Sequence, residues 1–283
     1  PYASDPTYMP ILLEIIEKTK PQLLYSQPDQ EIAVISKHRD MLLQEHGVRT
    51  FLPSDAAIVL CQDKYLSNKR WAEAGLTVPD AMLIESEADV EAAFERYGSP
   101  IWVRANYSPG GGRGAFKAEN MREAKGWLDF SDGWDGSFCA AECLTKHSVT
   151  WMAIYHEGEL VVAQGRRREY WEFANRAPSG VTGITGTGVT VSDPVVDEIA
   201  PRVIHAIDDC PHGIFSVDLC YDKQGVPNPT EINIGRFFTT HQFFTRAGLN
   251  LPHIFVKLAF GESTPTIPQK VNPLTPGLAW IRG

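Results

Sequence analysis

Apolar residues in the first part of the chain recur at helical spacing or gather in short runs. The apolar positions of residues 8–18 predict a helix, and "QLLYSQ" after it predicts a short buried strand. Residues 31–46 predict a second helix. A loop and a helix over about residues 62–74 follow, with Gly75 as its stop. Helix, strand and helix in this order favour an α/β layered domain.

The middle of the chain alternates between strand and helix patterns. "SEADVEAAFERYG" predicts a helix with Ser86 as N-cap, Asp89 three residues later, and Gly98 as C-cap. Residues 119–129 predict another helix, and "SFCAAECL" predicts a strand. "VTWMAIYHEGELVVAQ" predicts two strands that turn at Glu157-Gly158. A long polar, glycine-rich loop is expected at 165–194, a helix at 195–209, and a helical region after the last two strands.

Two strand patterns near the C-terminal end carry acidic residues. In "GIFSVDLCYD", alternation places Asp218 on the face opposite to the bulky apolar residues. In "TEINIG", Glu231 and Asn233 share a face. A hairpin centred between Gln224 and Gly225 makes Asp218 and Glu231 direct cross-strand partners.

Such a pair predicts a cation between the two strands. Like charges that face each other are destabilising, and a buried aspartate is costly without a partner. Mg²⁺ suits this position because it takes a few carboxylates together with substrate phosphates. The alternative is an exposed acidic face with Lys223 or Arg236 as its counter-charge.

The stretch "IWVRANYSPGGGRGAFKA", residues 101–118, holds a glycine-rich loop with three interpretations. A flexible linker is one, although the loop lies between apolar strands. A strand–loop–helix nucleotide site is another, but "GAFKA" looks like a strand and no GxxxxGK[ST] is present. The third is a hairpin tip whose N–H groups cover a phosphate, with Arg104 on the entering strand meeting the same phosphate.

Composition narrows the class of protein. The chain has 283 residues, 43% of them hydrophobic, which suggests about two domains. A net charge of −9 disfavours a nucleic-acid partner. The five cysteines form no CxxC pair and favour reduced thiols in the cytoplasm, although Cys139 and Cys143 could be metal ligands. No apolar run approaches the roughly 20 residues that span a membrane. The missing initiator Met and a strand-like "GLAWIRG" at the end suggest a piece of a longer chain.

Taken together, the glycine hairpin, the strand arginine and the acidic hairpin resemble the ATP-grasp superfamily. The likeness is greatest to the carbamoyl-phosphate-synthase-like branch of carboxylate–amine ligases. "DKYLSNKRWAEAGLTVPDAML" looks like the segment that opens the ATP-grasp domain, and "IWVRANYSPGGGRG" like the phosphate strand and loop. "GVTGITGTGVTVSDP" is similar to the glycine/threonine segment, and "EINIGRF" looks like the Glu-x-Asn metal signature.

The resemblance implies an α/β fold with α+β lobes and a partial N-terminal Rossmann-like domain. It implies three parts: a partial pre-ATP-grasp domain at 1–62, a small lobe with the glycine loop at 63–141, and a large lobe with the metal hairpin at 142–283. The family often has an acidic residue at the ribose position, and an arginine two residues after Glu-x-Asn. Here the ribose position offers a lysine and a histidine, and Arg236 comes three residues after Asn233.

The resemblance also implies roles for single residues. Lys64 and Arg104 would contact ATP phosphates, and Arg236 the transferred phosphoryl group or the carboxylate substrate. The β- and γ-phosphates would be covered by Gly110, Gly111, Gly112, Arg113 and Gly114. The adenine edge would be lined by Glu142, Cys143 and Leu144, with Lys146 or His147 at the ribose. The Mg²⁺ would be held by Asp218, Glu231 and Asn233.

Less specific interpretations stay open for several of these residues. Lys64 could be a surface helix residue, His147 a hydrogen-bonded strand histidine, and Cys143 a packing residue. The run of three arginines at 166–168 could bind an anionic substrate or form a solvated turn. Trp102 is expected to pack under the lid.

The implied activity is ATP-dependent ligation of a carboxylate and an amine through an acyl phosphate, with ATP and Mg²⁺ as cofactors. Its partners would be the small-molecule carboxylate and amine, with a homodimer possible and no nucleic acid or membrane. The alternative is an ATP-binding regulatory or structural subunit without ligase activity. A dinucleotide-dependent oxidoreductase is disfavoured because no GxGxxG lies between a strand and a helix.

Overall fold

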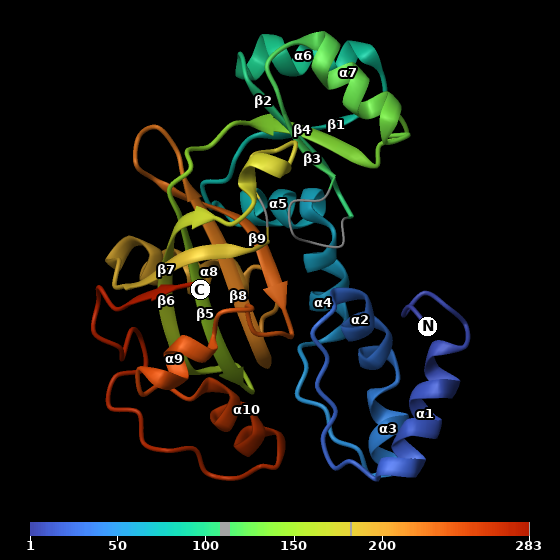
Figure 1. Cartoon of the computed structure of the whole chain (residues 1–283), viewed down its shortest axis with the longest axis vertical. Helices are drawn as coiled ribbons and strands as arrows, with labels where there is room; N and C mark the ends of the chain where they lie inside the picture. The colour runs from blue at the N-terminus through green and yellow to red at the C-terminus, as the bar shows by residue number, and fades with distance from the viewer. Residues whose placement is uncertain (108–113, 182, 283) are drawn as a thin grey trace.

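The computed structural model describes residues 1–107, 114–181 and 183–282. Its N-terminal part is helical (Figure 1), with α1 (Tyr8–Thr19), α2 (Asp29–Lys37), α3 (Arg39–His46), α4 (Asp55–Gln62) and α5 (Lys64–Glu73). The prediction of a strand at "QLLYSQ" is wrong, because only an isolated bridge joins Leu23 to Arg49. The helix expected at 31–46 is broken at His38, whose backbone leaves helical geometry. The helix expected at about 62–74 is present as α5, whereas α4 occupies residues expected as a loop. Asp63 ends α4 and caps α5 through the N–H groups of Tyr65 and Leu66.

A small antiparallel sheet with two helices forms the upper part of Figure 1. Its strands are β1 (Ala81–Ile84), β2 (Ile101–Ala105), β3 (Ala115–Ala118) and β4 (Phe138–Glu142), in the order β1-β4-β2-β3. The two helices, α6 (Glu87–Tyr97) and α7 (Met121–Phe130), share one apolar cluster with the sheet. The helix, cap and strand predictions for this stretch are confirmed.

A larger antiparallel sheet of six strands forms the lower part. Its strands, in the order β10-β7-β6-β5-β8-β9, are β5 (Ser148–His156), β6 (Glu159–Trp171), β7 (Thr185–Val191), β8 (Gly213–Tyr221), β9 (Pro227–Ile234) and β10 (Ala279–Ile281). The remaining helices are η1 (Ala174–Arg176), α8 (Pro194–His205), α9 (Gln242–Arg246) and α10 (Leu251–Ala259). The long loop expected at 165–194 is wrong in part, because β6 continues to Trp171 and β7 begins at Thr185.

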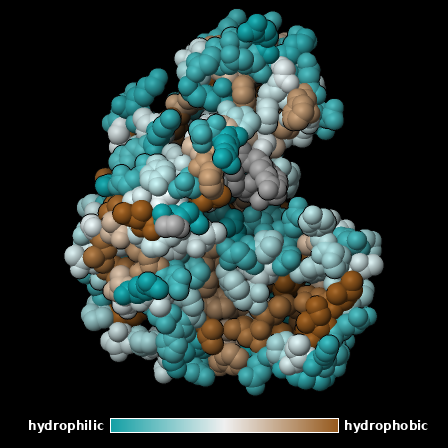
Figure 2. All heavy atoms as spheres, viewed as in Figure 1, coloured by the Kyte–Doolittle hydropathy of each residue, from teal (hydrophilic) through white to brown (hydrophobic). Residues whose placement is uncertain are grey.

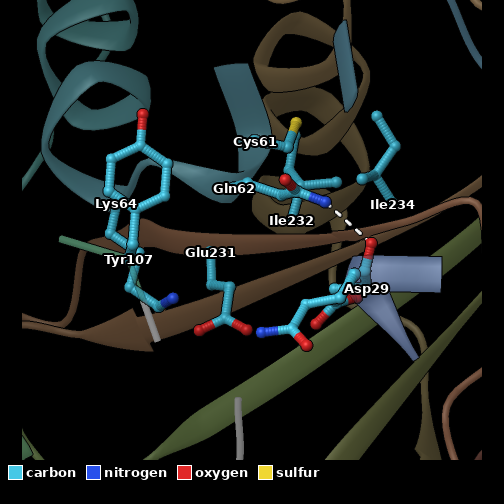
Figure 3. Close-up of a pocket in the computed structure, with 9 residues that line it drawn as sticks. Asp29, Cys61, Gln62, Lys64, Tyr107, Glu231, Ile232 and Ile234 are labelled. Carbon is cyan, nitrogen blue, oxygen red and sulfur yellow. Dashed lines mark hydrogen bonds between the residues drawn. The ribbon is translucent and has the colours of Figure 1, made fainter. Parts of the chain in front are cut away.

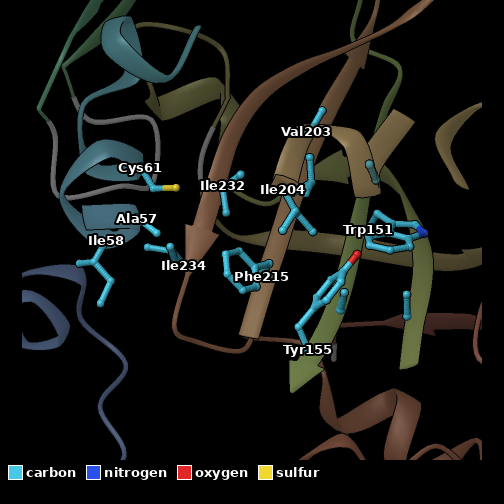
Figure 4. Packing of buried hydrophobic residues seen from close by; sticks show 14 of the residues in the cluster. Ala57, Ile58, Cys61, Trp151, Tyr155, Val203, Ile204, Phe215, Ile232 and Ile234 are labelled. Carbon is cyan, nitrogen blue, oxygen red and sulfur yellow. The ribbon is translucent and has the colours of Figure 1, made fainter. Parts of the chain in front are cut away.

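One face of the large sheet packs against helices. Figure 4 shows Phe215 of β8 with Val203 and Ile204 of α8 and with Ala57 and Ile58 of α4. Val217 of β8 and Trp71 of α5 belong to the same cluster. The indole nitrogen of Trp71 donates to the carbonyl oxygen of Val203 at 3.1 Å, which ties α5 to α8. Ser216 and Asp218 of β8 and Glu231 and Asn233 of β9 alternate with this cluster, so this stretch of the opposite face is polar. Ile214, further along the same face of β8, belongs to a second apolar cluster.

The surface has two features that bear on function. Figure 2 shows a notch between the small-sheet part and the helical N-terminal part. Apolar residues are exposed on α1 and α3, with Ile15 at 52% and Leu43 at 49%. Within the described residues, no helix has both the length and the apolar character to cross a membrane.

Candidate functional site

A single row of side chains runs across four strands of the large sheet. Arg166 of β6 pairs with Thr150 of β5, Thr150 pairs with Asp218 of β8, and Asp218 pairs with Glu231 of β9. The cross-strand partnership of Asp218 and Glu231 expected from the sequence is therefore present. Both carboxylates lie on the face opposite to the apolar cluster.

A bulge brings this pairing about. At the tip of the hairpin Tyr221 pairs with Pro227, so the turn is centred on Gln224 and not half a residue later. Leu219 pairs with Pro229 and Asp218 with Glu231, which leaves Thr230 as an extra residue. If the ladder ran on from Pro229 without the bulge, Thr230 would lie opposite Asp218, and Glu231 would lie opposite Val217 and point into the apolar cluster. The bulge therefore sets which face Glu231 occupies.

Asp218 is held by two hydrogen bonds and has one cation nearby. Thr150 donates its hydroxyl to one carboxylate oxygen, and Asn233 donates its amide to the other at 3.0 Å. The nearest cation is Arg168, with a terminal nitrogen 3.8 Å from the carboxylate. Neither Lys223 nor Arg236, the counter-charges considered from the sequence, has an ion pair with Asp218 in the described structure.

Arg236 is joined to the N-terminal helices. Its Nε and Nη2 donate to the two carboxylate oxygens of Asp29 at 2.6 and 3.2 Å. Nη2 also donates to the side-chain oxygen of Asn233. Burial by itself would lower the pKa of Arg236, but the ion pair with Asp29 and the charges of Glu231 and Asp218 together raise it. Arg236 thus supports Asn233 and closes the site toward α2.

Glu231 faces a pocket of about 150 Å³ at the border between β9 and the helical N-terminal part. Figure 3 shows the carboxylate of Glu231 between the side chains of Lys64 and Asp29. Among the described residues Glu231 makes no hydrogen bond or ion pair, so its oxygens are available to a ligand. Lys64 is buried, with 8% of its surface exposed, so the interpretation as a surface helix residue is wrong. A pocket of this volume fits a group the size of a phosphate, whereas whole small molecules need roughly 300 Å³ or more.

Arg104 reaches the same border from the small sheet. Nη1 donates to the carbonyl oxygen of Thr230 at 3.1 Å, and Nη2 to that of Lys64 at 3.4 Å. Its Nε is buried and has no partner within the described chain. The guanidinium therefore lies beside the backbone of Lys64, which is one of the residues that line the pocket.

The segment after β4 links the two sheets. Glu142 is the last residue of β4, and Cys143 and Leu144 follow where the ladder ends. Burial raises the pKa of Cys143 to about 11, so its thiol is neutral and suits packing rather than chemistry. Lys146 and His147 are exposed, and the His147 ring stacks on Tyr221 with centroids 4.2 Å apart. The interpretation of His147 as a hydrogen-bonded strand histidine is wrong, since it is exposed and precedes β5.

Part of the glycine loop lies outside the described residues: Gly110, Gly111, Gly112 and Arg113. Gly114 is described, with φ +75°, and its carbonyl oxygen accepts from the N–H of Ala105 at 2.9 Å. β2 and β3 pair antiparallel on either side of this loop, from Ile101–Ala118 to Arg104–Ala115. A strand therefore follows the loop, which rules out the strand–loop–helix interpretation.

The oxygen donors on the hairpin fit Mg²⁺. Asp218 has lone pairs left after its two hydrogen bonds, and Glu231 has all of its own. Across 1–107, 114–181 and 183–282, no cluster of three or more His, Cys, Asp or Glu side chains could hold a metal. Two carboxylates and one amide are a sparse set, and Mg²⁺ accepts such a set because it keeps waters and substrate phosphates as further ligands.

Several residues of the site were not expected from the sequence. Asp29 begins α2 and Thr150 lies in β5. Only the fold brings Asp29 to Arg236 and Thr150 to Asp218. Arg166 is buried in β6, so the solvated-turn interpretation is wrong for it. Tyr107 lines the pocket beside Lys64, and its place two residues after the end of β2 is the one signal that could have found it.

Comparisons with known proteins give no matching family model. The sequence is similar to carbamoyl phosphate synthase large chains. That of Rubrobacter xylanophilus is 26% identical over 159 residues, which cover 53% of this chain and 15% of that protein. The N-terminal section of the Aquifex aeolicus protein is 29% identical over 134 residues, covering 44% and 24%. The chain therefore matches less than a quarter of the length of these relatives.

Solved structures agree over more of the chain. The biotin carboxylase of Campylobacter jejuni, in a complex described as β,γ-ATP, has a TM-score of 0.71 at 16% identity, covering 92% of this chain and 59% of that one. N5-carboxyaminoimidazole synthetase of Staphylococcus aureus with ADP has a TM-score of 0.70 at 15% identity, covering 94% and 66%. D-alanine-D-alanine ligase of Coxiella burnetii has 0.64 at 16%, covering 84% and 68%. The chain has the ATP-grasp fold.

Proposed function

We propose that this chain with the ATP-grasp fold forms the ATP site of a carboxylate–amine ligase that works through an acyl phosphate. The observation that carries the proposal is the direct pairing of Asp218 with Glu231 on a polar sheet face. Lys64 and Arg104 supply positive charge at the border of that face. Opposed carboxylates with cations at their edge suit a divalent cation and a polyphosphate.

Within this proposal, the nucleotide lies between the two sheets. Lys64 and Arg104 contact its phosphates, and the loop from Gly110 to Gly114 covers the β- and γ-phosphates. The adenine edge meets the segment of Glu142, Cys143 and Leu144, with Lys146 or His147 at the ribose. Asp218, Glu231 and Asn233 hold Mg²⁺, which when bound neutralises charge on the transferred phosphoryl group.

The chemistry takes two steps. A carboxylate oxygen of the substrate attacks the γ-phosphorus of ATP, the bond to the bridging oxygen breaks, and ADP leaves. The nitrogen of an amine then attacks the acyl carbon, inorganic phosphate leaves, and the nitrogen loses a proton. No protein nucleophile is needed, so the residues act by positioning and charge neutralisation.

Two arginines have distinct parts in this proposal. Arg104 would face the phosphates with the guanidinium that now bridges Thr230 and Lys64. Arg236 holds Asn233 in place. Its Nη1 makes no hydrogen bond among the described residues and would face the transferred group or the substrate carboxylate. The substrates are a small-molecule carboxylate and amine, and a homodimer stays a prediction.

The test is calorimetric titration of Mg·ATP into the protein and its Glu231→Gln variant. Glu159→Gln, an exposed change at the start of β6, is the matched control. We expect micromolar binding that requires Mg²⁺, at least tenfold weaker in Glu231→Gln and unchanged in the control. No binding by the unaltered chain would refute the nucleotide site.

ADP release across a panel of carboxylates, each with and without amines, then tests the ligase activity. ADP release that depends on a carboxylate would support it. Nucleotide binding without ADP release across the panel would favour the regulatory or structural subunit.

A further inference from the structure

Two arginines of β6 lie on the same face as the acidic pair. Arg166 and Arg168 are two residues apart on the strand, so their side chains point to the same side. Arg166 pairs with Thr150, and Arg168 with Ser148, on β5. Asp218 is the next residue across the sheet from Thr150. The polar face therefore has a positive end on β6 and a negative end on β8 and β9.

Arg166 is buried, and among the described residues its guanidinium nitrogens bind no carboxylate. Only 1% of its surface is exposed. Nη1 donates to the hydroxyls of Thr185 and Thr240 at 3.2 and 2.9 Å, and Nη2 to that of Thr150 at 2.7 Å. The ring of Phe238 lies 4.3 Å from the guanidinium carbon, and Nε has no partner in the described chain. A buried cation held by neutral groups alone is costly, so its retention calls for an anion nearby.

Arg168 is the accessible member of the two. Its side chain is 14% exposed, and Nε donates to the hydroxyl of Thr185 at 3.1 Å. The Trp171 ring lies 5.2 Å from the guanidinium carbon. The 3.8 Å separation from Asp218 is too long for a hydrogen bond. Among the described residues the terminal N–H groups of Arg168 make no hydrogen bond, so an oriented fork of donors faces the site.

The surrounding strand is shaped for these arginines. A Cβ added at Gly188 of β7 would lie 3.0 Å from Cδ of Arg166, so glycine makes the room that the buried side chain needs. Burial, and secondly the charge of Arg168, lowers the pKa of Arg166 to about 9, so Arg166 is still a cation at neutral pH. Two adjacent cations thus persist in this part of the sheet.

The charge balance changes when the site is loaded. Asp218 is the carboxylate nearest to the two arginines. A Mg²⁺ held by Asp218 and Glu231, as the proposed function requires, would take up the charge of Asp218. The positive charges of Arg166 and Arg168 would then have no negative partner nearby while a substrate is bound. A bound oxyanion restores the balance.

We propose that Arg168, backed by the buried Arg166, forms an oxyanion subsite on β6 next to the metal-binding pair. Its ligand is a carboxylate or phosphoryl group, which a planar guanidinium can bind through two parallel hydrogen bonds. The group comes either from the substrate acid or from the nucleotide. The subsite deepens the proposed function. It rests on that function because the bound Mg²⁺ is what removes Asp218 as the counter-charge of the two arginines.

The test compares the unaltered chain with Arg168→Gln, and Arg167→Gln is the matched control. Arg167 is the next residue of β6, on the opposite face, with an exposed ion pair to Glu169 at 2.6 Å. Calorimetry measures the affinity for the Mg²⁺ complex of a non-hydrolysable ATP analogue. Saturation-transfer NMR on the formate proton then measures formate binding to the complex with Mg·ADP. Arg168→Lys keeps the charge without the fork, and thermal unfolding checks that every variant is folded.

The outcomes separate the two sources of the oxyanion. Nucleotide binding at least tenfold weaker in Arg168→Gln alone assigns a nucleotide phosphate to the subsite. Unchanged nucleotide affinity with formate binding lost in Arg168→Gln assigns the substrate carboxylate. Arg168→Lys should lose less than Arg168→Gln in either case. Nucleotide and formate binding that are both unchanged in Arg168→Gln would overturn the proposal.

A failure of the proposed function is distinguishable. If the unaltered chain binds no nucleotide, the ATP site is refuted, and formate and orthophosphate are titrated into the nucleotide-free protein. Weaker binding of either anion in Arg168→Gln than in Arg167→Gln then supports the subsite by itself. Equal binding in the two variants, or none in the unaltered chain, overturns it.

Discussion

Arg104 of the small sheet donates to the carbonyl oxygen of Thr230, the bulge residue of the large sheet, over 3.1 Å. The bulge leaves Thr230 without a partner residue across the ladder, which frees its carbonyl for this contact. The other terminal nitrogen of Arg104 reaches the carbonyl oxygen of Lys64 at the start of α5. One side chain therefore joins β2, β9 and α5 around the pocket.

Arg104→Met should lower the free energy of unfolding by about 1–2 kcal/mol, because two hydrogen bonds from a charged group are lost. Urea denaturation measures it. Arg96→Met on the same part of the chain is the control, since its ion pair with Asp80 is exposed and should change stability by less than about 0.5 kcal/mol. Equal effects of the two changes would contradict a bridging role for Arg104.

Thr150→Val should weaken the hold on Asp218. The threonine hydroxyl accepts from Arg166 and donates to Asp218, and valine keeps the shape while removing both hydrogen bonds. We expect a loss of about 1–3 kcal/mol in the free energy of unfolding, since Arg166 is left with an unsatisfied donor. Thr187→Val on β7, whose hydroxyl has no hydrogen bond among the described residues, is the control. A loss no larger than that of the control would count against the relay from Arg166 to Asp218.

Asp89→Ala should destabilise the start of α6 by about 1 kcal/mol at neutral pH. The carboxylate accepts from the N–H groups of Glu85 and Ser86 at 3.0 and 2.8 Å. These hydrogen bonds, that from Glu85 first, lower the pKa of Asp89. The stabilisation is therefore present above the unfolded-state pKa of about 3.9 and is lost as the pH falls through the folded-state value. Glu91→Ala, an exposed change on α6, should cost less at neutral pH; a penalty for Asp89→Ala that persists at pH 2 would refute the cap.

His212 should make stability fall as the solution becomes mildly acidic. Burial is the main cause that lowers its pKa, followed by the charge of His156, whose ring centroid is 5.3 Å away. The unfolded state binds the proton more readily, so stability declines as the pH drops below about 6.5. Denaturation between pH 7 and pH 5 should show the unaltered chain losing more free energy than His212→Gln. His253→Gln, an exposed change on α10, should leave the pH dependence unaltered; identical curves for all three proteins would be the contrary result.

The hairpin of β8 and β9 could be predicted because its information is local. Alternation along each strand and the distance between them place Asp218 opposite Glu231. The bulge was not predictable, since a one-residue slip in the turn and one extra residue at Thr230 offset each other. The pairing of Asp218 with Glu231 was thus predicted correctly from a turn centred between Gln224 and Gly225, whereas the actual turn is centred on Gln224.

Other features depend on contacts that no local pattern contains. Asp29 and Arg236 are 207 residues apart in the sequence. No sequence motif around either residue predicts their ion pair. From the sequence, the arginines of β6 fit either an anion site or a solvated turn. The sequence could not show that Arg166 is buried, because the three hydroxyls around it come from β5, β7 and the segment before α9. The strand was therefore mistaken for a polar loop.

The bulge at Thr230 makes the hairpin respond to single-residue deletions according to their position. Beyond the bulge, the parity of the strand decides which side chains face the site. Removing Ile232 would put Asn233 in its place and turn the amide into the apolar cluster. Removing Thr230 would leave an unbroken ladder in which Glu231 still faces Asp218, although Arg104 would lose its carbonyl. A deletion at Thr230 therefore keeps Glu231 and Asn233 on the polar face, whereas a deletion at Ile232 keeps the acidic pair and removes Asn233 from that face.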